Sequence, residues 1–312
     1  MKAGTLVAIG VTSALLGALV AATHPFWRVL QKSDRQDSRV ESLAWLLPEP
    51  PPQPPPPAEI AVFQPDQVQQ LSRNDGSTMS VGYSSVILDP RWVDLEFFGG
   101  WNREFEANRD GEALLFFTGP TFEKGHPNEP LGMVLHGDLM LSDGIRRAGN
   151  RAAASERAYI AVTEAGELRY GFGDLTPERQ DRYRLFIGGL HAFAHRDSTP
   201  PSSYRGVYGP MRLADVRIVY GFRPDGRLEV IETDDGVLFD DLHRFVQARG
   251  FTAAFLPDHA SKSRLIVPGR RVWSEEQAVW VSGGKPSITA LPFMMRVLPR
   301  TLSSASARTP TS

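Results

Sequence analysis

The sequence predicts an α+β fold, a strand-rich single domain in which one main amphipathic helix packs on a mixed or antiparallel sheet. Three observations predict it. Short apolar runs rich in β-branched and aromatic residues recur along the chain, glycine turns join several of them, and one segment, 238–250, has helical periodicity. The chain has 312 residues, 41% hydrophobic and 22% charged, which is enough for one large domain with a buried core.

An apolar segment, AGTLVAIGVTSALLGALVAA, opens the chain at residues 3–22 and contains no charge. At about 1.5 Å per residue it crosses a hydrocarbon core of about 30 Å. We expect residues 1–30 to be a transmembrane anchor or a signal peptide. The cleaved alternative rests on Val20-Ala21-Ala22, small residues typical of a cleavage site.

We expect the folded domain to lie outside the cytoplasm, in the periplasm or at the cell surface, and the protein to contact the membrane through this helix. The basic residues that follow the segment favour the opposite orientation by the positive-inside rule. They are Arg28, Lys32, Arg35 and Arg39.

A proline-rich stretch comes next, with eight prolines in the eleven residues Leu47–Pro57. Such a composition excludes helix and central strand and favours extended polyproline II. We therefore predict a linker over 31–60, a folded domain over 61–299 and a disordered tail over 300–312, where apolar periodicity is absent.

Within the domain, strands are predicted in order at 80–89, 92–98, 113–118, 131–136, 158–164, 167–172, 216–222, 227–232, 252–256, 264–267 and 278–282. Glycine turns at Glu164-Ala165-Gly166 and Arg223-Pro224-Asp225-Gly226 are typical of hairpins. The predicted helix has acids in its first turns, an apolar stripe and a terminal Gly250.

Composition also excludes some functions. The net charge of −2 and the pI of about 6.4 give no basic surface, so we expect no nucleic-acid partner. The absence of cysteine excludes disulfides and thiolate metal sites. We predict no cofactor and no bound metal.

The stretch FTAAFLPDHASKS, 251–263, brings together side chains that transfer protons or bind anions. They are Asp258, His259, Ser261, Lys262 and Ser263. The end of a buried strand is a natural place for a site, so this cluster is the candidate functional region.

The order of elements and several spaced motifs resemble the phosphodiester glycosidase family over about Val93–Val297. Family members have a strand ending in Asn-Gly-Gly-Phe-Phe, a Pro-x-Gly strand, an Arg-x-x-x-Gly strand with an Asp-Gly hairpin, and a final Leu-Asp-Gly-Gly-x-Ser. The corresponding stretches here are FFTGPTFE (116–123), EPLGMVLHGDL (129–139), VRIVYGFRPDG (216–226) and FLPDHASKS (255–263).

The resemblance implies hydrolysis of a sugar phosphodiester or glycan linkage, with a glycan or glycosyl phosphate as partner. It implies Asp258 as the acid or base, His259 as a second proton-transfer group and Arg217 as a phosphate clamp. The other substrate-binding candidates are Thr118, Gly119, Ser261, Lys262 and Ser263.

This chain departs from the family where glycines bring bare backbone to the phosphate. Pro120 replaces one glycine and removes an N–H donor, and His259 and Ala260 add Cβ atoms. The alternative function is therefore a non-catalytic glycan-binding or structural envelope module with a degenerate site.

Three further patterns have simpler explanations. HAFAHRD, 191–197, spaces His191, His195 and Asp197 for one strand face, but further metal ligands are not identifiable, so we expect unligated histidines. Asp234-Asp235 with Asp240-Asp241 fits acids at a helix start. Trp101, beside Gly99-Gly100, is the aromatic residue that we expect to be exposed.

Overall fold

The computed structural model describes residues 55, 57–125, 132–195, 199–206, 214–234, 236–258, 262–274, 281–282, 285–286 and 290–300. All of them belong to one compact unit, Pro54–Ser312. The predicted membrane segment, and the predicted tail apart from Arg300, lie outside these ranges. Across them, no helix is both long and apolar enough to span a bilayer.

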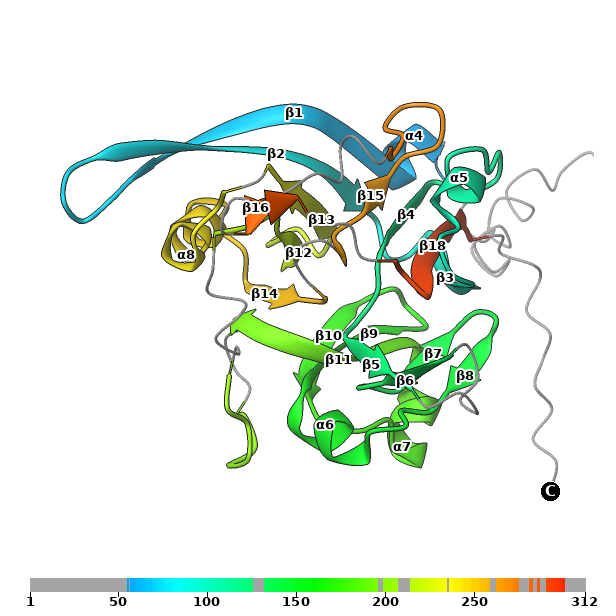
Figure 1. Ribbon diagram of the computed structural model, residues 1–312. Helices are drawn as coiled ribbons and strands as arrows, with labels where there is room; N and C mark the ends of the chain where they lie inside the picture. Colours follow the sequence, from blue (N-terminus) through cyan, green and yellow to red (C-terminus); the bar gives the residue numbers. More distant parts are fainter. Residues whose placement is uncertain are drawn as a thin grey trace, which may run out of the picture. The chain divides into compact units, whose positions relative to one another are not determined.

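The α+β prediction with one main helix is wrong. Strands account for 46% of the structure and helices for 15%, and the strands form several sheets. The helices in the described ranges are short: α4 (Pro57–Ile60), α5 (Glu104–Ala107), α6 (Arg151–Glu156), α7 (Pro177–Arg182) and α8 (Phe239–Ala248). Even α8 has only ten residues, so paired strands and not helix packing organise the fold (Figure 1).

A ten-stranded sheet forms the larger layer. Its order is β1 (Ala61–Ser72), β2 (Thr78–Leu88), β13 (Leu228–Thr233), β12 (Ile218–Phe222), β14 (Ala253–Leu256), β11 (Tyr183–Ala194), β7 (Leu139–Leu141) and β8 (Gly144–Arg146). β9 (Ala158–Thr163) also pairs with β11, and β10 (Leu168–Phe172) pairs with β9. These pairings are all antiparallel.

A four-stranded sheet forms the second layer, in the order β15 (Leu265–Ile266), β4 (Leu115–Thr118), β18 (Phe293–Pro299) and β3 (Val93–Gly99). Two hairpins complete the strands: β5 (Phe122–Lys124) with β6 (Met133–Leu135), and β16 (Val281–Ser282) with β17 (Lys285–Pro286).

The main hydrophobic core joins the two sheets. Phe117 of β4 meets Tyr220 of β12 edge to face, with ring centroids 5.2 Å apart, and the Tyr220 hydroxyl donates to the backbone oxygen of Thr118. A second cluster lies on the other face of the large sheet, where α8 places Leu242, Phe245 and Val246. Alternation within β12 separates the two clusters: Tyr220 belongs to the first and Val219 to the second.

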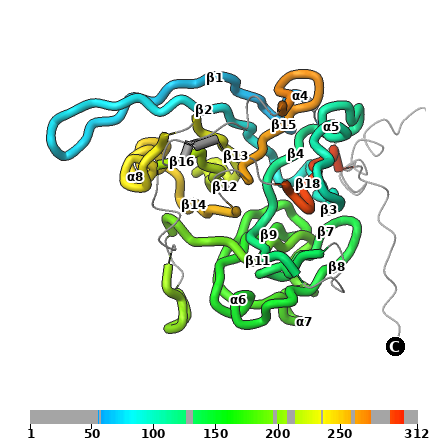
Figure 2. The backbone as a smooth tube through the Cα atoms, in the orientation of Figure 1, coloured from blue at the N-terminus to red at the C-terminus, as the bar shows by residue number. Residues whose placement is uncertain are grey.

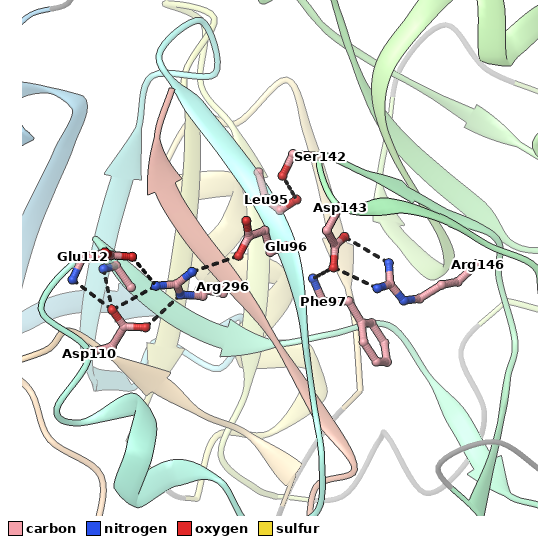
Figure 3. Close-up of polar contacts among 10 residues, drawn as sticks. Leu95, Glu96, Phe97, Asp110, Glu112, Ser142, Asp143, Arg146 and Arg296 are labelled. Atoms are coloured by element: carbon pink, nitrogen blue, oxygen red, sulfur yellow. Dashed lines mark hydrogen bonds and ion pairs between the residues drawn. The ribbon is translucent and has the colours of Figure 1, made fainter. Parts of the chain in front are cut away.

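Polar contacts also connect the layers, as Figure 3 shows. The Ser142 hydroxyl, after β7, donates to Leu95 O of β3 at 2.7 Å, and Phe97 N of β3 donates to the Asp143 carboxylate at 3.2 Å. Within the small sheet, Arg296 of β18 bonds to three carboxylates, and its hydrogen bonds to Asp110 are the main cause of the raised pKa of its guanidinium. The other two acceptors are Glu96 and Glu112.

The hairpin β1–β2 runs along the edge of the large sheet and reaches α8 (Figures 1 and 2). Arg73, just past β1, forms a two-point ion pair with Asp241 of α8, at 2.7 and 3.0 Å. At the other end, Ile60, the last residue of the predicted linker, is buried in the main core. Asp89 N donates to Ile60 O at 2.9 Å, so the ordered chain begins before residue 61.

Candidate functional site

The ends of β4 and β14 and the approach to β15 meet at one point. Thr118 N donates to Arg264 O at 3.0 Å, and Arg264 N donates to the Thr118 hydroxyl at 2.7 Å. The same hydroxyl donates to Lys262 O at 2.7 Å, and Asp258 N donates to Gly119 O at 3.3 Å. Four of the predicted site residues are therefore brought together: Thr118, Gly119, Asp258 and Lys262.

Thr118 and Gly119 hold this junction through structural contacts. The Thr118 side chain is 1% exposed and its hydroxyl bonds are made to the segment 262–264. A methyl group added at Gly119 would overlap the ring of Phe293 at less than 3.0 Å. Their contacts therefore position the loop that carries Lys262, and a role in substrate binding stays a prediction.

Asp258 and Lys262 form the charged centre. Lys262 Nζ lies 2.8 Å from Asp258 Oδ2 and 4.4 Å from the centroid of the Phe122 ring. The Asp258 side chain is 2% exposed and that of Lys262 is 25% exposed, so Lys262 is the member of the pair that solutes can reach. Burial, and then the charge of Asp258, raise the pKa of the Tyr220 phenol well above its usual value.

Arg217 lies just before β12, beside Thr233 of β13. Its backbone N donates to the Thr233 hydroxyl at 2.9 Å and its O accepts from Thr233 N, which continues the β12–β13 ladder. By alternation it shares the sheet face of Val219, the face that α8 covers. Burial lowers the pKa of its guanidinium, and the charge of Asp215 opposes that shift. Its predicted role as a phosphate clamp stays a prediction.

Two of the candidates in FLPDHASKS, His259 and Ser261, lie outside the described residues. Ser263 is 6% exposed, and its hydroxyl is buried without a hydrogen-bond partner in the described part of the chain. The carbonyl of Ser263 accepts from Arg264 Nη1 at 2.8 Å.

Three residues that the sequence analysis did not assign complete the site: Thr121, His136 and Arg157. His136 directly follows β6, and its N donates to Thr121 O at 3.1 Å, one rung beyond the β5–β6 ladder. The Thr121 hydroxyl accepts from Arg157 and donates to Gly189 O at 3.0 Å. Arg157 is 7% exposed, so a buried cation stands beside the imidazole.

The electrostatics of His136 connect this group to Asp258. Burial, and then the charge of Arg157, lower the pKa of the imidazole, while the charges of Glu123 and Asp258 oppose the shift. His136 Nε2 lies 3.7 Å from Glu123 Oε2, which is too long for a hydrogen bond. The lowered pKa leaves the ring neutral at neutral pH.

Glycines let the backbone segments beside His136 approach closely. A methyl group at Gly137 would overlap Gly188 and Gly189 at less than 3.0 Å, and Gly189 has φ +79°. Gly188 and Gly189 lie inside β11, at a register shift between Ile187 and Leu190. This bulge places Gly189 O against the Thr121 hydroxyl.

The other patterns have ordinary surroundings. His191 is buried on β11 opposite Leu256, and the His195 ring packs edge-on against Phe172 at 5.6 Å. Among the residues that the structure describes, no group of three His, Asp or Glu side chains is placed to hold a metal ion. Asp197 lies outside that part. Trp101 is 40% exposed, as expected.

The fold is similar to that of a solved glycosidase. The catalytic domain of zebrafish N-acetylglucosamine-1-phosphodiester α-N-acetylglucosaminidase, auto-inhibited by its pro-peptide, superposes with a TM-score of 0.53 and 13% identity. The match covers 78% of this chain and 84% of that one. At this identity it shows a distant fold relationship.

Two further solved structures are similar at lower scores. A hypothetical protein from Synechocystis gives a TM-score of 0.45 at 10% identity and covers 78% of this chain and 62% of that one. A putative exported protein from Burkholderia pseudomallei gives 0.39 at 10%, covering 70% and 74%. No protein-family model matches the sequence, and no curated protein matches it.

Proposed function

We propose that this protein hydrolyses a glycosyl phosphodiester at the cluster formed by His136, Arg157, Asp258 and Lys262. The observation that carries the proposal is the meeting of two cations, a carboxylate and a neutral imidazole from separate strands at one place. The similarity to the zebrafish glycosidase fold supports the substrate class.

Each charge has a use in that reaction. The phosphodiester is an anion, and Lys262, whose side chain is partly exposed, is the cation placed to bind it. Departure of the phosphate leaves positive charge on the anomeric carbon, and a nearby carboxylate such as Asp258 stabilises that charge. The ion pair at 2.8 Å keeps both groups in position.

The test is turnover of methyl N-acetylglucosamine-1-phosphodiester and of a panel of other sugar phosphodiesters. Turnover is measured as the release of free sugar and of phosphate monoester. Lys262→Met should raise KM by about 10-fold or more, because the substrate loses one charge-assisted hydrogen bond and the binding free energy that it contributes. Lys124→Met, an exposed lysine on β5, is the matched control and should leave KM unchanged.

Asp258→Asn separates the enzyme from the binding module. Loss of a charge that acts in the transition state lowers kcat, whereas in a pure binding site the effect is on affinity alone. If the wild-type protein releases no sugar from any member of the panel yet binds glycans, the hydrolase proposal is wrong and the binding module remains.

A further inference from the structure

The imidazole of His136 is unusual because both of its nitrogens are buried and neither has a hydrogen-bond partner among the described residues. Its side chain is 14% exposed. Leaving a buried polar group unsatisfied costs about 1–3 kcal/mol, so such groups are rare outside places with a functional use. His136 also lies in the cluster with Arg157 and Lys262, the cations proposed to face the substrate, so its ring is placed to take part in the reaction.

Two contacts fix the backbone at His136. The ladder bond to Thr121 O sets the backbone, and Gly137, the next residue, is pressed against Gly188 and Gly189. A proton-transfer group needs such a fixed place.

The charged groups that act on His136 come from three elements. They are Glu123 on β5, Arg157 at the start of β9 and Asp258 after β14. Burial, and then the charge of Arg157, keep the ring neutral, and Glu123, 3.7 Å from Nε2, stabilises the imidazolium once it forms. A hydrogen on Nε2 that faces Glu123 leaves the lone pair on Nδ1 free to accept a proton.

We propose that His136 is the general base of this hydrolysis and that Glu123 is the positioning residue that stabilises its protonated form. The inference rests on the function proposed above. Both ring nitrogens are closed to solvent, so the water that reacts must reach His136 together with the substrate. His136 takes a proton from this water while the water oxygen bonds to the anomeric carbon. The bond between that carbon and the phosphate oxygen breaks, and its electron pair leaves with the phosphate monoester. The imidazolium then returns the proton to solvent.

The need for a base rather than an acid follows from the leaving group. A phosphate monoester is a stable anion and departs without protonation, whereas water is a poor nucleophile until it loses a proton. A neutral imidazole meets that need at neutral pH, and its protonation in acid stops the reaction.

The experiment uses the full-length protein and measures kcat/KM for the phosphodiester from pH 4.5 to 9, a range of about 2 units on each side of an ordinary histidine pKa. His136→Gln should lower kcat/KM by about 10²- to 10⁴-fold and abolish the acidic limb of the profile. Glu123→Gln should move that limb to lower pH, because the charge of Glu123 raises the pKa of His136. His243→Gln and Glu178→Gln, on α8 and α7, are controls that leave the profile unchanged.

A second measurement does not depend on turnover. Carbon-13 NMR of the seven histidines, with His136 assigned by its loss in His136→Gln, should show His136 titrating below the usual range and lower still in Glu123→Gln. Glu123 is exposed, so this variant folds even if His136→Gln does not.

The outcomes separate the two proposals. No sugar release by the wild-type protein overturns the hydrolysis itself. Release with an acidic limb that persists in a folded His136→Gln, or that does not move in Glu123→Gln, overturns the role of His136 alone.

Discussion

At the scale of single residues, the loop that carries Lys262 depends on a buried ion pair. Arg264 Nε lies 3.0 Å from Glu104 Oε1, and the two side chains are 1% and 5% exposed. The Arg264 guanidinium also lies 4.3 Å from the ring centroid of Trp273. Burial lowers the pKa of Arg264, and the charge of Glu104 opposes that shift. The pair anchors the segment whose backbone holds Thr118.

Removing one partner should be costly. We expect Glu104→Gln to lower the free energy of unfolding by about 3–5 kcal/mol, because it removes the carboxylate that is paired with the buried guanidinium of Arg264. Urea denaturation measures it. Glu112→Gln removes an exposed partner of Arg296 and should cost at most about 1 kcal/mol. Similar losses of unfolding free energy in the two variants would mean that burial does not determine how much an ion pair contributes to stability.

Two buried histidines should make stability depend on pH. Burial is the main cause that lowers the pKa values of His136 and His243. Below the usual value of 6.5 the unfolded chain binds protons that the folded chain excludes, so both groups destabilise the protein as pH falls from 6.5 toward their folded pKa values. Melting temperatures at pH 7.5 and 5.5 should therefore differ less in His136→Gln/His243→Gln than in the wild type. Equal differences would show that neither group is linked to folding in this range.

The sequence identified only part of the site at this scale. Asp258 and Lys262 were found because they are four residues apart in one polar stretch, and the structure pairs them. His136 and Arg157 come from distant strands, and their nearness to Asp258 arises only from sheet packing. The signal that was available was a histidine and an arginine at the ends of predicted strands.

At the scale of elements, hairpins with clear turns were predictable. β12–β13 and β9–β10 form as expected, with Gly226 and Gly166 at φ +82° and +83°. β11 was missed because Gly188-Gly189 reads as a turn, although a bulge accommodates it within a strand. β1 was missed because Pro65 and several glutamines interrupt its apolar pattern. Its bulge between Gln64 and Gln67, with Pro65, also makes this edge a poor template for other strands.

The close approach of Gly137 to β11 should make this position intolerant of a side chain. Gly137→Ala should destabilise the protein by about 1–3 kcal/mol or more and lower activity, because the added methyl group meets rigid backbone beside His136. Gly111→Ala is the matched control, since a methyl group there meets nothing within 4 Å. Denaturation of the two variants gives the comparison, and a Gly137→Ala protein as stable as Gly111→Ala would contradict the close approach.

At the scale of the whole molecule, one core couples the two sheets. The α+β prediction failed here because strand periodicity in the sequence does not show which strands share a sheet, and the strands divided between two layers that pack on each other. Phe117 and Tyr220 meet across that division, and β3 is bonded to the β7–β8 turn. The two layers should therefore unfold together.

Phe117→Ala tests the coupling. The ring is fully buried, so its loss should cost about 3–5 kcal/mol, and the protein should still unfold in one transition with the same midpoint by fluorescence and by circular dichroism. Phe105→Ala, at a side chain 63% exposed, should change stability by less than about 0.5 kcal/mol. Two separate transitions in the wild type would show that the sheets are independent.

The contact of Gly137 with Gly188 and Gly189 also limits how these positions can evolve. A side chain at Gly137 or Gly189 would lie within 3.0 Å of backbone, and one at Gly188 would crowd Asp138 O at 3.1 Å, so substitutions that are tolerated elsewhere are disfavoured at these three positions. Glycines spaced as Gly137, Gly188 and Gly189, with a histidine before the first, form a search pattern for relatives whose overall sequence similarity has been lost.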